Sequence, residues 1–292
     1  MADRLSALLQ RFELRAHVLH SGALAEAARF HAAPGAGQLH LLRRGRLRLV
    51  DAKGRRRLLD EPALLFYARP AAYRLEPLPA GQGEPADLVS ASIEFGAGDD
   101  NPMLRALPSP LLVPLAQLPA LGPIQRLLFG EALGNRCGRD AAVDRLAEVL
   151  VIQLLRHAIE QRLVDGGLLA GLADLRLHKA ITAVHGQPAR AWTLASMAEA
   201  AGMSRARFAA HFTGTVGVPP GEYLTGWRLG LARSLLRRGL PVKRVAAEVG
   251  YAHASALGRI FAQRVGVSPS AWLAQQAGSA DAPGVPPGDP PG

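Results

Sequence analysis

The chain has 292 residues, 49% of them hydrophobic and 5% aromatic, which is enough for two ordinary domains with sizeable cores. Its formal net charge is +10, and residues 170–276 alone carry +9 because 13 Lys and Arg stand there against 4 Asp and Glu; such a segment attracts polyanions such as DNA, RNA or anionic lipid. The single cysteine excludes an internal disulfide and a multi-cysteine zinc site, and the lack of an 18-residue uncharged apolar run or a signal-peptide core predicts a cytoplasmic protein without a transmembrane helix.

The first predicted elements are short β-strands between about residues 15 and 100. Arginine and leucine alternate over 46–49, which puts the leucines on one face of a strand and the arginines on the other. Further strand patterns cover 63–67, 73–75 and 88–95, with Pro and Gly breaks between them. This spacing predicts a small antiparallel barrel or sandwich. This region also carries four arginines that would face either an anionic ligand or solvent: Arg43, Arg44, Arg46 and Arg48.

Two helices follow the strands. Six prolines between residues 102 and 123 exclude one long helix there, and the next apolar patterns, over about 124–133 and 141–163, have helical spacing. The stripe of the second helix would pack on the chain's own barrel or form a dimer surface; it comprises Val143, Leu146, Leu150, Leu154 and Ile159. Asp165, Gly166 and Gly167 end this helix and indicate a domain boundary near residues 165–172. Between the helices, we expect Cys137 to be a small buried apolar residue.

The most specific signal is an internal near-repeat in the C-terminal third, with copies at about 194–223 and 242–272. Each copy has a short helix with small apolar residues, a glycine, an apolar pair four residues apart, a second glycine and a proline. These positions are Met197, Ala198, Gly202, Phe208, Phe212, Gly217 and Pro220 in the first copy, and Val245, Ala246, Gly250, Leu257, Phe261, Gly266 and Pro269 in the second. The second copy has one more residue in its turn or early helix.

Each repeated residue type has a physical reason. A glycine ends a helix well because its left-handed conformation carries no Cβ penalty, and an apolar pair four residues apart buries one face of the next helix. The pattern therefore predicts helix, tight turn and second helix, twice over. Between the copies, residues 220–238 form an amphipathic pattern for a helix about 28 Å long. A connector of that length would suit two recognition helices in successive major grooves, which lie about 34 Å apart.

These residues resemble the AraC/XylS family of transcription regulators over about 105 residues. The matching signatures include Ala198–Arg205, Phe208 with Phe212, Gly217–Tyr223, Trp227–Leu229, Val245–Tyr251 and Arg259–Phe261. The N-terminal region is similar to the cupin-type sensor domain of one branch of that family. That similarity depends on Asp3–Ser6 with Leu9, on Leu39–Leu41 and on Gly45–Val50.

The resemblance implies an α+β multidomain fold. A cupin-like sensor or dimerisation domain would occupy 1–168, with its barrel at about 15–100 and helices at about 124–165, and an all-α DNA-binding domain with two helix-turn-helix units would occupy 172–275. Residues 277–292, rich in Gly and Pro, would form a disordered tail. The expected function is that of a sequence-specific, effector-responsive transcription activator. Its partners would be double-stranded DNA, a small-molecule effector, RNA polymerase and a second copy of the chain.

The family places base-reading residues on the exposed face of the second helix of each unit. Candidate DNA-binding residues are Ser204, Arg205, Ala206, Arg207, Ala210 and His211 in the first unit, and Lys243, Arg244, Ala254, Ser255 and Arg259 in the second. Family members often carry large polar residues where this chain has alanines, and a methyl group can only touch a thymine methyl. Direct readout would then depend on Arg205, Arg207, Ser255 and Arg259, and on DNA shape. Lys243 and Arg244 lie in the first turn of a helix, where the dipole disfavours cations unless a phosphate is near.

Enzymatic and metal-binding functions have little support in the residues. The histidines of the barrel region are His17, His20, His31 and His40, with no His-x-His, and Tyr73 stands where related sensor domains tend to place a histidine. We therefore expect no metal and no cofactor. The alternatives to a regulator are a non-specific architectural DNA-binding protein and an enzyme fused to this module. A repair enzyme of the alkyl-transfer type would need more than one cysteine.

Overall fold

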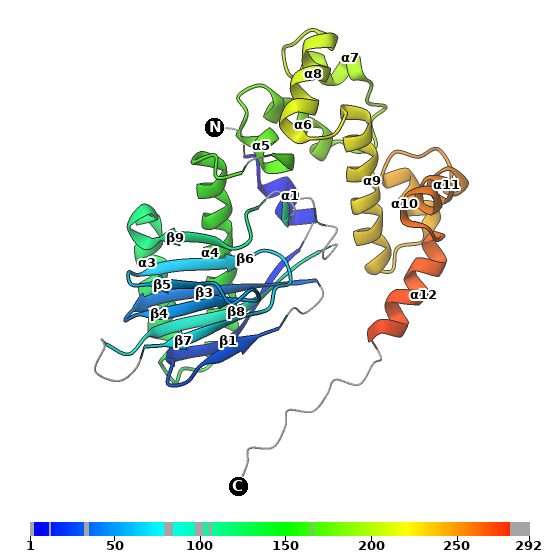
Figure 1. The fold of residues 1–292 in the computed structure, drawn as a ribbon. Coiled ribbons are helices and arrows are strands. Elements are labelled where there is room, and N and C mark those ends of the chain that lie inside the picture. Colours follow the sequence, from blue (N-terminus) through cyan, green and yellow to red (C-terminus); the bar gives the residue numbers. More distant parts are fainter. Residues whose placement is uncertain are drawn as a thin grey trace. The chain divides into compact units, whose positions relative to one another are not determined.

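The computed structural model describes residues 3–11, 13–31, 35–78, 84–96, 101, 103–104, 107–164 and 166–280 (Figure 1). The chain divides into two compact units. The first consists of Met1–Gly186 with Trp192–Tyr223, and the second of Gln187–Ala191 with Leu224–Gly292. In the predicted tail, residues 277–280 belong to a helix and residues 281–292 lie outside the described residues.

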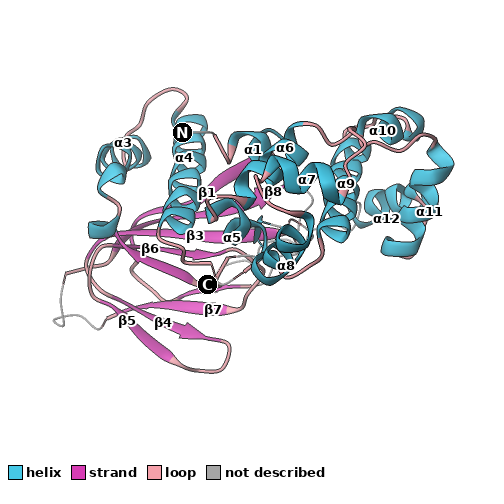
Figure 2. Ribbon diagram, turned by 90° about the horizontal axis from the view of Figure 1, so that it is seen from above, coloured by secondary structure: helices cyan, strands magenta, loops and turns pink. Residues whose placement is uncertain are grey.

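Two antiparallel sheets form most of the N-terminal part of the first unit (Figure 2). One has the order β1-β8-β3-β6-β9 and the other β2-β7-β4-β5. The strand bounds are β1 Leu14–Ala23, β2 Ala28–Phe30, β3 Ala36–Arg44, β4 Leu47–Asp51, β5 Arg56–Leu59, β6 Ala63–Tyr67, β7 Tyr73–Pro77, β8 Asp87–Phe95 and β9 Leu111–Pro114. The strands predicted at 46–49, 63–67, 73–75 and 88–95 are therefore confirmed.

Apolar side chains from both sheets form one core. Leu47 and Leu49 of β4 are buried beside Leu75 of β7 and Leu42 of β3, whereas Arg48, between the two leucines, is half-exposed. This confirms the alternation expected over 46–49, in which one face of the strand turns to the core and the other to solvent.

A histidine lies within this core. His40 of β3 is 2% exposed; its Nδ1 lies 2.8 Å from Ser90 Oγ and its Nε2 lies 2.5 Å from Tyr73 Oη. Phe30 and Tyr67 stack on opposite sides of the Tyr73 ring, with centroids 5.0 and 4.0 Å away. Burial lowers the pKa of His40 to about 3, so the ring is neutral near pH 7. The described part of the chain contains no group of three or more His, Cys, Asp or Glu that could hold a metal ion.

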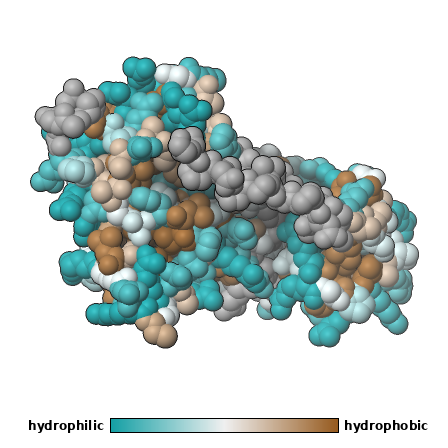
Figure 3. Space-filling view, turned by 90° about the horizontal axis from the view of Figure 1, so that it is seen from below, coloured by the Kyte–Doolittle hydropathy of each residue, from teal (hydrophilic) through white to brown (hydrophobic). Residues whose placement is uncertain are grey.

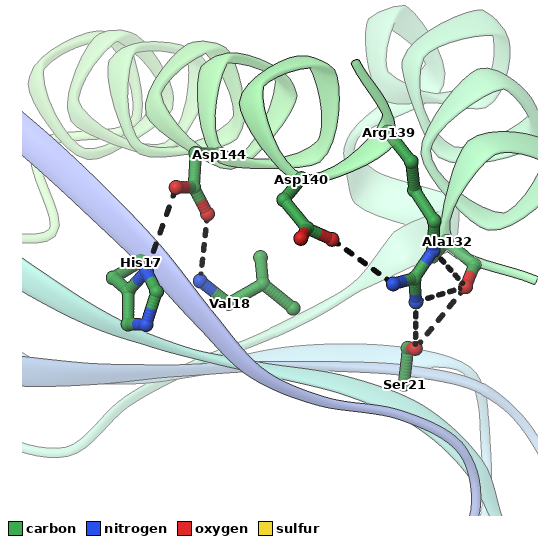
Figure 4. Close-up of polar contacts among 7 residues, drawn as sticks. All are labelled: His17, Val18, Ser21, Ala132, Arg139, Asp140 and Asp144. Atoms are coloured by element: carbon green, nitrogen blue, oxygen red, sulfur yellow. Dashed lines mark hydrogen bonds and ion pairs between the residues drawn. The ribbon is translucent and has the colours of Figure 1, made fainter. Parts of the chain in front are cut away.

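Two helices cover this domain, α3 (Gly122–Ala132) and α4 (Arg139–Glu160), after the short 3-10 turns η2 (Leu115–Gln117) and η3 (Pro119–Leu121). Four residues of the α4 stripe are buried and Leu146 is half-buried, because α4 packs along β1 of the chain's own sheet and against α3. At the bulge between Val18 and His20 of β1, Asp144 of α4 accepts a hydrogen bond from the Val18 N–H at 2.8 Å (Figure 4). Arg139 donates to the Ala132 carbonyl and to Ser21 Oγ, which ties the α3–α4 connection to β1 (Figure 4).

Two short helices, α5 (Gly167–Ala173) and α6 (Leu177–Gly186), lead from α4 to the C-terminal third, and α1 (Ser6–Arg11), from the start of the chain, packs against α6. Arg4 donates from Nη1 to the Leu172 carbonyl at 2.8 Å, which ties the N-terminal segment to α5. α5 packs against α4, α6 and α8, so the first unit is continuous from the sheets to the first repeat copy.

The structure overturns or refines several expectations. Cys137 is exposed, so the prediction of a buried cysteine was wrong; it lies in the polar α3–α4 connection, where no core is available. α4 ends at Glu160, before the predicted glycines, and Asp165 lies outside the described residues. Asp87 pairs with Arg43 and Arg44, and Glu76 lies 3.7 Å from Arg48, so the chain's own carboxylates face three of the four sheet arginines.

The rest of the described chain is helical, with α7 (Leu194–Ala200), α8 (Arg205–Val216), α9 (Pro220–Arg237), α10 (Val242–Glu248), α11 (Ala254–Val265) and α12 (Pro269–Ala280). The second unit has its own core, in which Val245, Leu257, Phe261 and Trp272 are buried with Leu235. No helix among the described residues is long and apolar enough to cross a membrane. The face shown in Figure 3 is mainly hydrophilic, with separate small apolar patches.

Candidate nucleic-acid interface

The first helix-turn-helix consists of α7 and α8. Thr193 caps α7: its Oγ1 accepts from the Ser196 N–H at 3.1 Å, and Ser196 Oγ accepts from the Thr193 N–H at 2.9 Å. Met197 and Ala198 face inward, and Gly202 adopts φ +63° after the helix ends. The left-handed residue lets the Met203 N–H return to the Ala198 carbonyl at 2.9 Å. The turn is therefore built as the glycine pattern predicted.

α8 buries one face and exposes the other. Phe208 and Phe212 are 0% and 2% exposed, and the Phe212 ring meets Tyr223 of α9 at 5.2 Å between centroids. The opposite side of α8 is solvent-exposed, and it carries the predicted residues Arg205, Ala206, Arg207, Ala210 and His211. Ser204 occupies the N-cap position but makes no side-chain capping hydrogen bond. These six residues therefore share one accessible region at the second helix of the motif.

The second helix-turn-helix repeats this plan with α10 and α11. Val245 and Ala246 of α10 and Leu257 and Phe261 of α11 are buried, and Gly250 adopts φ +84° in the turn. Three residues lie between Gly250 and the start of α11, whereas two lie between Gly202 and the start of α8, so the extra residue lies in the turn. Of the predicted contact residues, Lys243, Arg244, Ser255 and Arg259 are exposed and Ala254 is half-buried.

Two predicted residues have partners within the chain. The Asp174 Oδ2 lies 2.8 Å from His211 Nε2, and Arg244 donates from Nε to Glu248 at 3.0 Å, one turn along α10. Partial burial raises the pKa of Asp174, but the hydrogen bonds from the Leu177 and Arg176 amides and from His211 outweigh it, and the pKa lies below its usual value. The carboxylate therefore stays ionised near neutral pH and orients the His211 ring beside α8.

Arg228 of α9 is a structural residue whose role the sequence did not reveal. Its Nε donates to the Pro188 carbonyl at 3.0 Å and its Nη2 to the Arg190 carbonyl at 2.8 Å. The guanidinium also lies 5.6 Å from the centroid of the Tyr251 ring, beside Gly250. Burial lowers the pKa of Arg228 somewhat, and Tyr251 offsets part of that effect. Arg228 thus ties the 187–191 segment to the second turn, and the Trp-Arg-Leu signature at 227–229 was the available sequence signal.

The buried pair His185 and Tyr223 connects α6 to α9. His185 Nε2 lies 2.6 Å from Tyr223 Oη, and burial raises the pKa of Tyr223 well above its ordinary value. Tyr223 also contacts Phe212 of α8. The start of α9 is thereby fixed against the first helix-turn-helix.

Comparison with known proteins agrees with this architecture. A cupin family model matches residues 3–160, and a helix-turn-helix domain model matches residues 197–275. The chain is 36% identical over 193 residues to an uncharacterized HTH-type transcriptional regulator of Haemophilus influenzae, covering 66% of this chain and 64% of that protein. It is 36% identical over 195 residues to a putative AraC-like transcription regulator of Streptomyces lividans, covering 65% and 64%. The match therefore spans slightly less than two thirds of these relatives.

A solved structure also matches this chain, at low similarity. The fatty-acid-bound ToxT of Vibrio cholerae matches over 90% of this chain and 94% of its own, at 15% identity and a TM-score of 0.39. A cupin family model matches more than half of the chain, so the chain belongs to the cupin family; its C-terminal third matches a helix-turn-helix domain model and is similar to the AraC-like transcription regulators named above.

Proposed function

We propose that this protein is a sequence-specific transcription regulator that binds DNA with α8 and α11 in successive major grooves. The observation that carries the proposal is the shared design of the two helices: each buries an apolar face and leaves a face with arginines exposed. The +9 charge of residues 170–276 supports it, because phosphate neutralisation and counterion release supply much of the affinity for DNA. An 18-residue α9 is about 27 Å long, which suits a connector between neighbouring grooves.

Base readout would depend on a few side chains. Arg205, Arg207 and Arg259 can each pair with O6 and N7 of a guanine, an interaction worth about 1–3 kcal/mol of discrimination against another base. Ser255 adds a hydroxyl. Ser204, His211, Lys243 and Arg244 would lie near phosphates, and His211 already has an orienting carboxylate in Asp174.

A non-specific architectural protein is the second candidate, and one observation favours it. Ala206 and Ala210 occupy exposed positions on α8 and offer no hydrogen bond to a base edge. Specificity would then have to come from three arginines, thymine methyl contacts and DNA shape. The two candidates predict different footprints, because a regulator protects discrete sites and an architectural protein protects DNA uniformly.

The cupin domain would supply regulation rather than catalysis. We propose that it responds to a small-molecule effector, that the protein acts in the cytoplasm on chromosomal DNA, and that it works as an activator through RNA polymerase, as a dimer on paired half-sites. Since α4 uses its apolar stripe inside the chain, a dimer would need another surface.

Selection from a random duplex library with the full chain tests the proposal. We expect an enriched motif with two half-sites about one helical turn apart, and tighter binding to that motif than to scrambled DNA. Arg207→Ala and Arg259→Ala should each relax the preference at one base position. Arg57→Ala is the matched control, because Arg57 is exposed on β5 and makes no ion pair with a described residue. Recovery of no motif, or equal effects of all three variants, would refute sequence-specific recognition.

A further inference from the structure

A cavity of about 280 Å³ lies beside the first recognition helix, within the first unit. Its walls come from three segments far apart in the sequence: Arg162 after α4, the Asp174–Arg176 stretch between α5 and α6, and the Met203–His211 stretch of the first helix-turn-helix. Arg162 and Arg176 lie outside the region matched by the helix-turn-helix model, and neither belongs to the proposed DNA contacts.

The charge of this cavity is unbalanced. Arg162, Arg176 and Arg207 line it with His211, and the only acidic side chain on its walls is Asp174. None of these three guanidinium groups forms an ion pair or side-chain hydrogen bond with a described residue. The Asp174 carboxylate is already engaged: Oδ1 accepts from the Arg176 and Leu177 amides, both at 2.8 Å, and Oδ2 lies 2.8 Å from His211 Nε2. The cavity therefore keeps a net positive charge of at least two with no internal counterion among the described residues.

The backbone does not explain an arginine at position 162. Arg162 adopts φ +51° just after α4 ends. Among the described residues, it is the one residue other than glycine whose φ is positive. Helix ends in this conformation favour Gly or Asn, because other side chains cost about 1 kcal/mol there. The Arg162 N–H bonds to the Ile159 carbonyl at 3.3 Å and the Leu163 N–H to the Ala158 carbonyl at 2.9 Å, which hold this strained turn and keep Arg162 on the wall of the cavity.

We propose that this cavity is an oxyanion site that takes a phosphate group. Guanidinium groups bind oxyanions through paired N–H donors, and a phosphate ester offers two or three charged or polar oxygens to several such donors at once, whereas one carboxylate is satisfied by a single fork. Because Arg207 and His211 belong to α8, the occupant contacts the recognition helix directly. Two sources would supply a group of this chemistry. One is a phosphodiester of bound DNA, and in that case the inference rests on the proposed function. The other is a free phosphorylated small molecule.

The first experiment asks whether DNA is the source. The full chain and the variants Arg162→Gln, Arg176→Gln and the double variant are titrated with the selected duplex over a series of salt concentrations, with Arg57→Gln as a control that removes the same charge from β5. If a DNA phosphate fills the cavity, the double variant binds about tenfold more weakly than the control. The slope of log K against log salt then falls in magnitude by about 0.9, the value for one phosphate.

The second experiment asks whether a free phosphate group is the source. Inorganic phosphate is titrated calorimetrically into the DNA-free full chain, followed by the same titration of the double variant and of Arg57→Gln. Saturable binding that the double variant loses and the control keeps supports the site with a free occupant. The inference is overturned if the double variant matches Arg57→Gln in both experiments. Failure of the proposed function is a separate result, since it appears as absence of a selected motif with the unaltered chain while phosphate binding is still measurable.

Discussion

Gly250 is the residue at which the second turn has least room. A Cβ added there would lie 2.7 Å from Arg228 Nη2 and 2.9 Å from Ala189 Cα, in a backbone of φ +84°. We predict that Gly250→Ala lowers the free energy of unfolding by about 2–3 kcal/mol, from left-handed strain and from loss of the Arg228 contacts. Gly202→Ala is the matched control: φ is +63° and nothing lies within 4 Å, so it should cost about 1 kcal/mol. Urea denaturation checks this, and equal losses would contradict the role given to Arg228.

His40 should make stability depend on pH. Its pKa is about 3 in the folded protein and about 6.5 in the unfolded chain, so the unfolded state binds more protons as pH falls below 6.5. The stabilisation that comes from a neutral His40 is therefore fully present above pH 6.5. As the pH falls from 6.5 to 3, it is lost at about 1.4 kcal/mol per pH unit. Between pH 7.5 and pH 5 we predict a loss of about 2 kcal/mol, which His40→Gln should lack.

Urea midpoints at the two pH values measure that difference, since every other titrating group is common to both proteins. As an independent readout, the NMR signals of the His40 ring should not titrate above pH 5. A ring that titrates near pH 6.5 would show that His40 is not held neutral by burial.

At the scale of an element, the two helices of the first recognition motif start differently. Thr193 and Ser196 form a reciprocal cap on α7, whereas Ser204 stands at the start of α8 without a side-chain capping bond. We predict that Thr193→Ala destabilises the protein by about 1 kcal/mol, because the Ser196 N–H loses its acceptor. Ser204→Ala should change stability by much less, as measured by thermal or urea unfolding. A larger loss for Ser204→Ala would place the important cap on the other helix.

The helical elements followed from local signals and several strands did not. Each glycine, proline and apolar pair of the repeat acts over a few residues, so the order of the repeat helices and the bounds of α9 could be predicted from spacing, whereas the end of α12 at Ala280 lies within the tail predicted to be disordered. β1 lies at a sheet edge; apart from the buried Ala16, its residues are exposed or half-buried, so its burial has no clear period. β9 pairs with β6 across some fifty residues, Ala63 with Pro114, and the prolines around it obscured the strand. Such pairings depend on tertiary contacts that no local pattern contains.

Apart from the half-buried Ala254, the predicted contact residues of the recognition helices are exposed, but their neighbours could not be predicted. Exposure of Arg205, Arg207 and Arg259 follows from helical period once the buried phenylalanines are placed. The carboxylate of Asp174 beside His211, 37 positions away in the sequence, follows only from the fold. The same is true of Arg228 reaching the 188 and 190 carbonyls.

At the scale of the whole molecule, the chain can be divided in two ways, and each division predicts a different pattern of cooperative unfolding. The sequence predicts a boundary between residues 168 and 172, which would separate the sheets and α4 from both recognition motifs. The packing groups the first motif with the sheets, because α5 contacts α4 on one side and α8 on the other, and it leaves α10 to α12 in a separate unit. Cooperative unfolding distinguishes these divisions, since residues that share a core lose protection together.

Leu154→Ala tests them, because Leu154 is 0% exposed in α4 and its truncation should cost about 2–5 kcal/mol. If the packing defines the cooperative unit, hydrogen exchange monitored by mass spectrometry should speed up in the sheets and also in α7 and α8, while α10 and α11 stay unchanged. Phe261→Ala, which removes a 0% exposed ring from the other core, should give the reverse pattern. Faster exchange confined to residues before 168 in Leu154→Ala would instead support the boundary predicted from the sequence, because the first recognition motif would then keep its stability without the sensor domain.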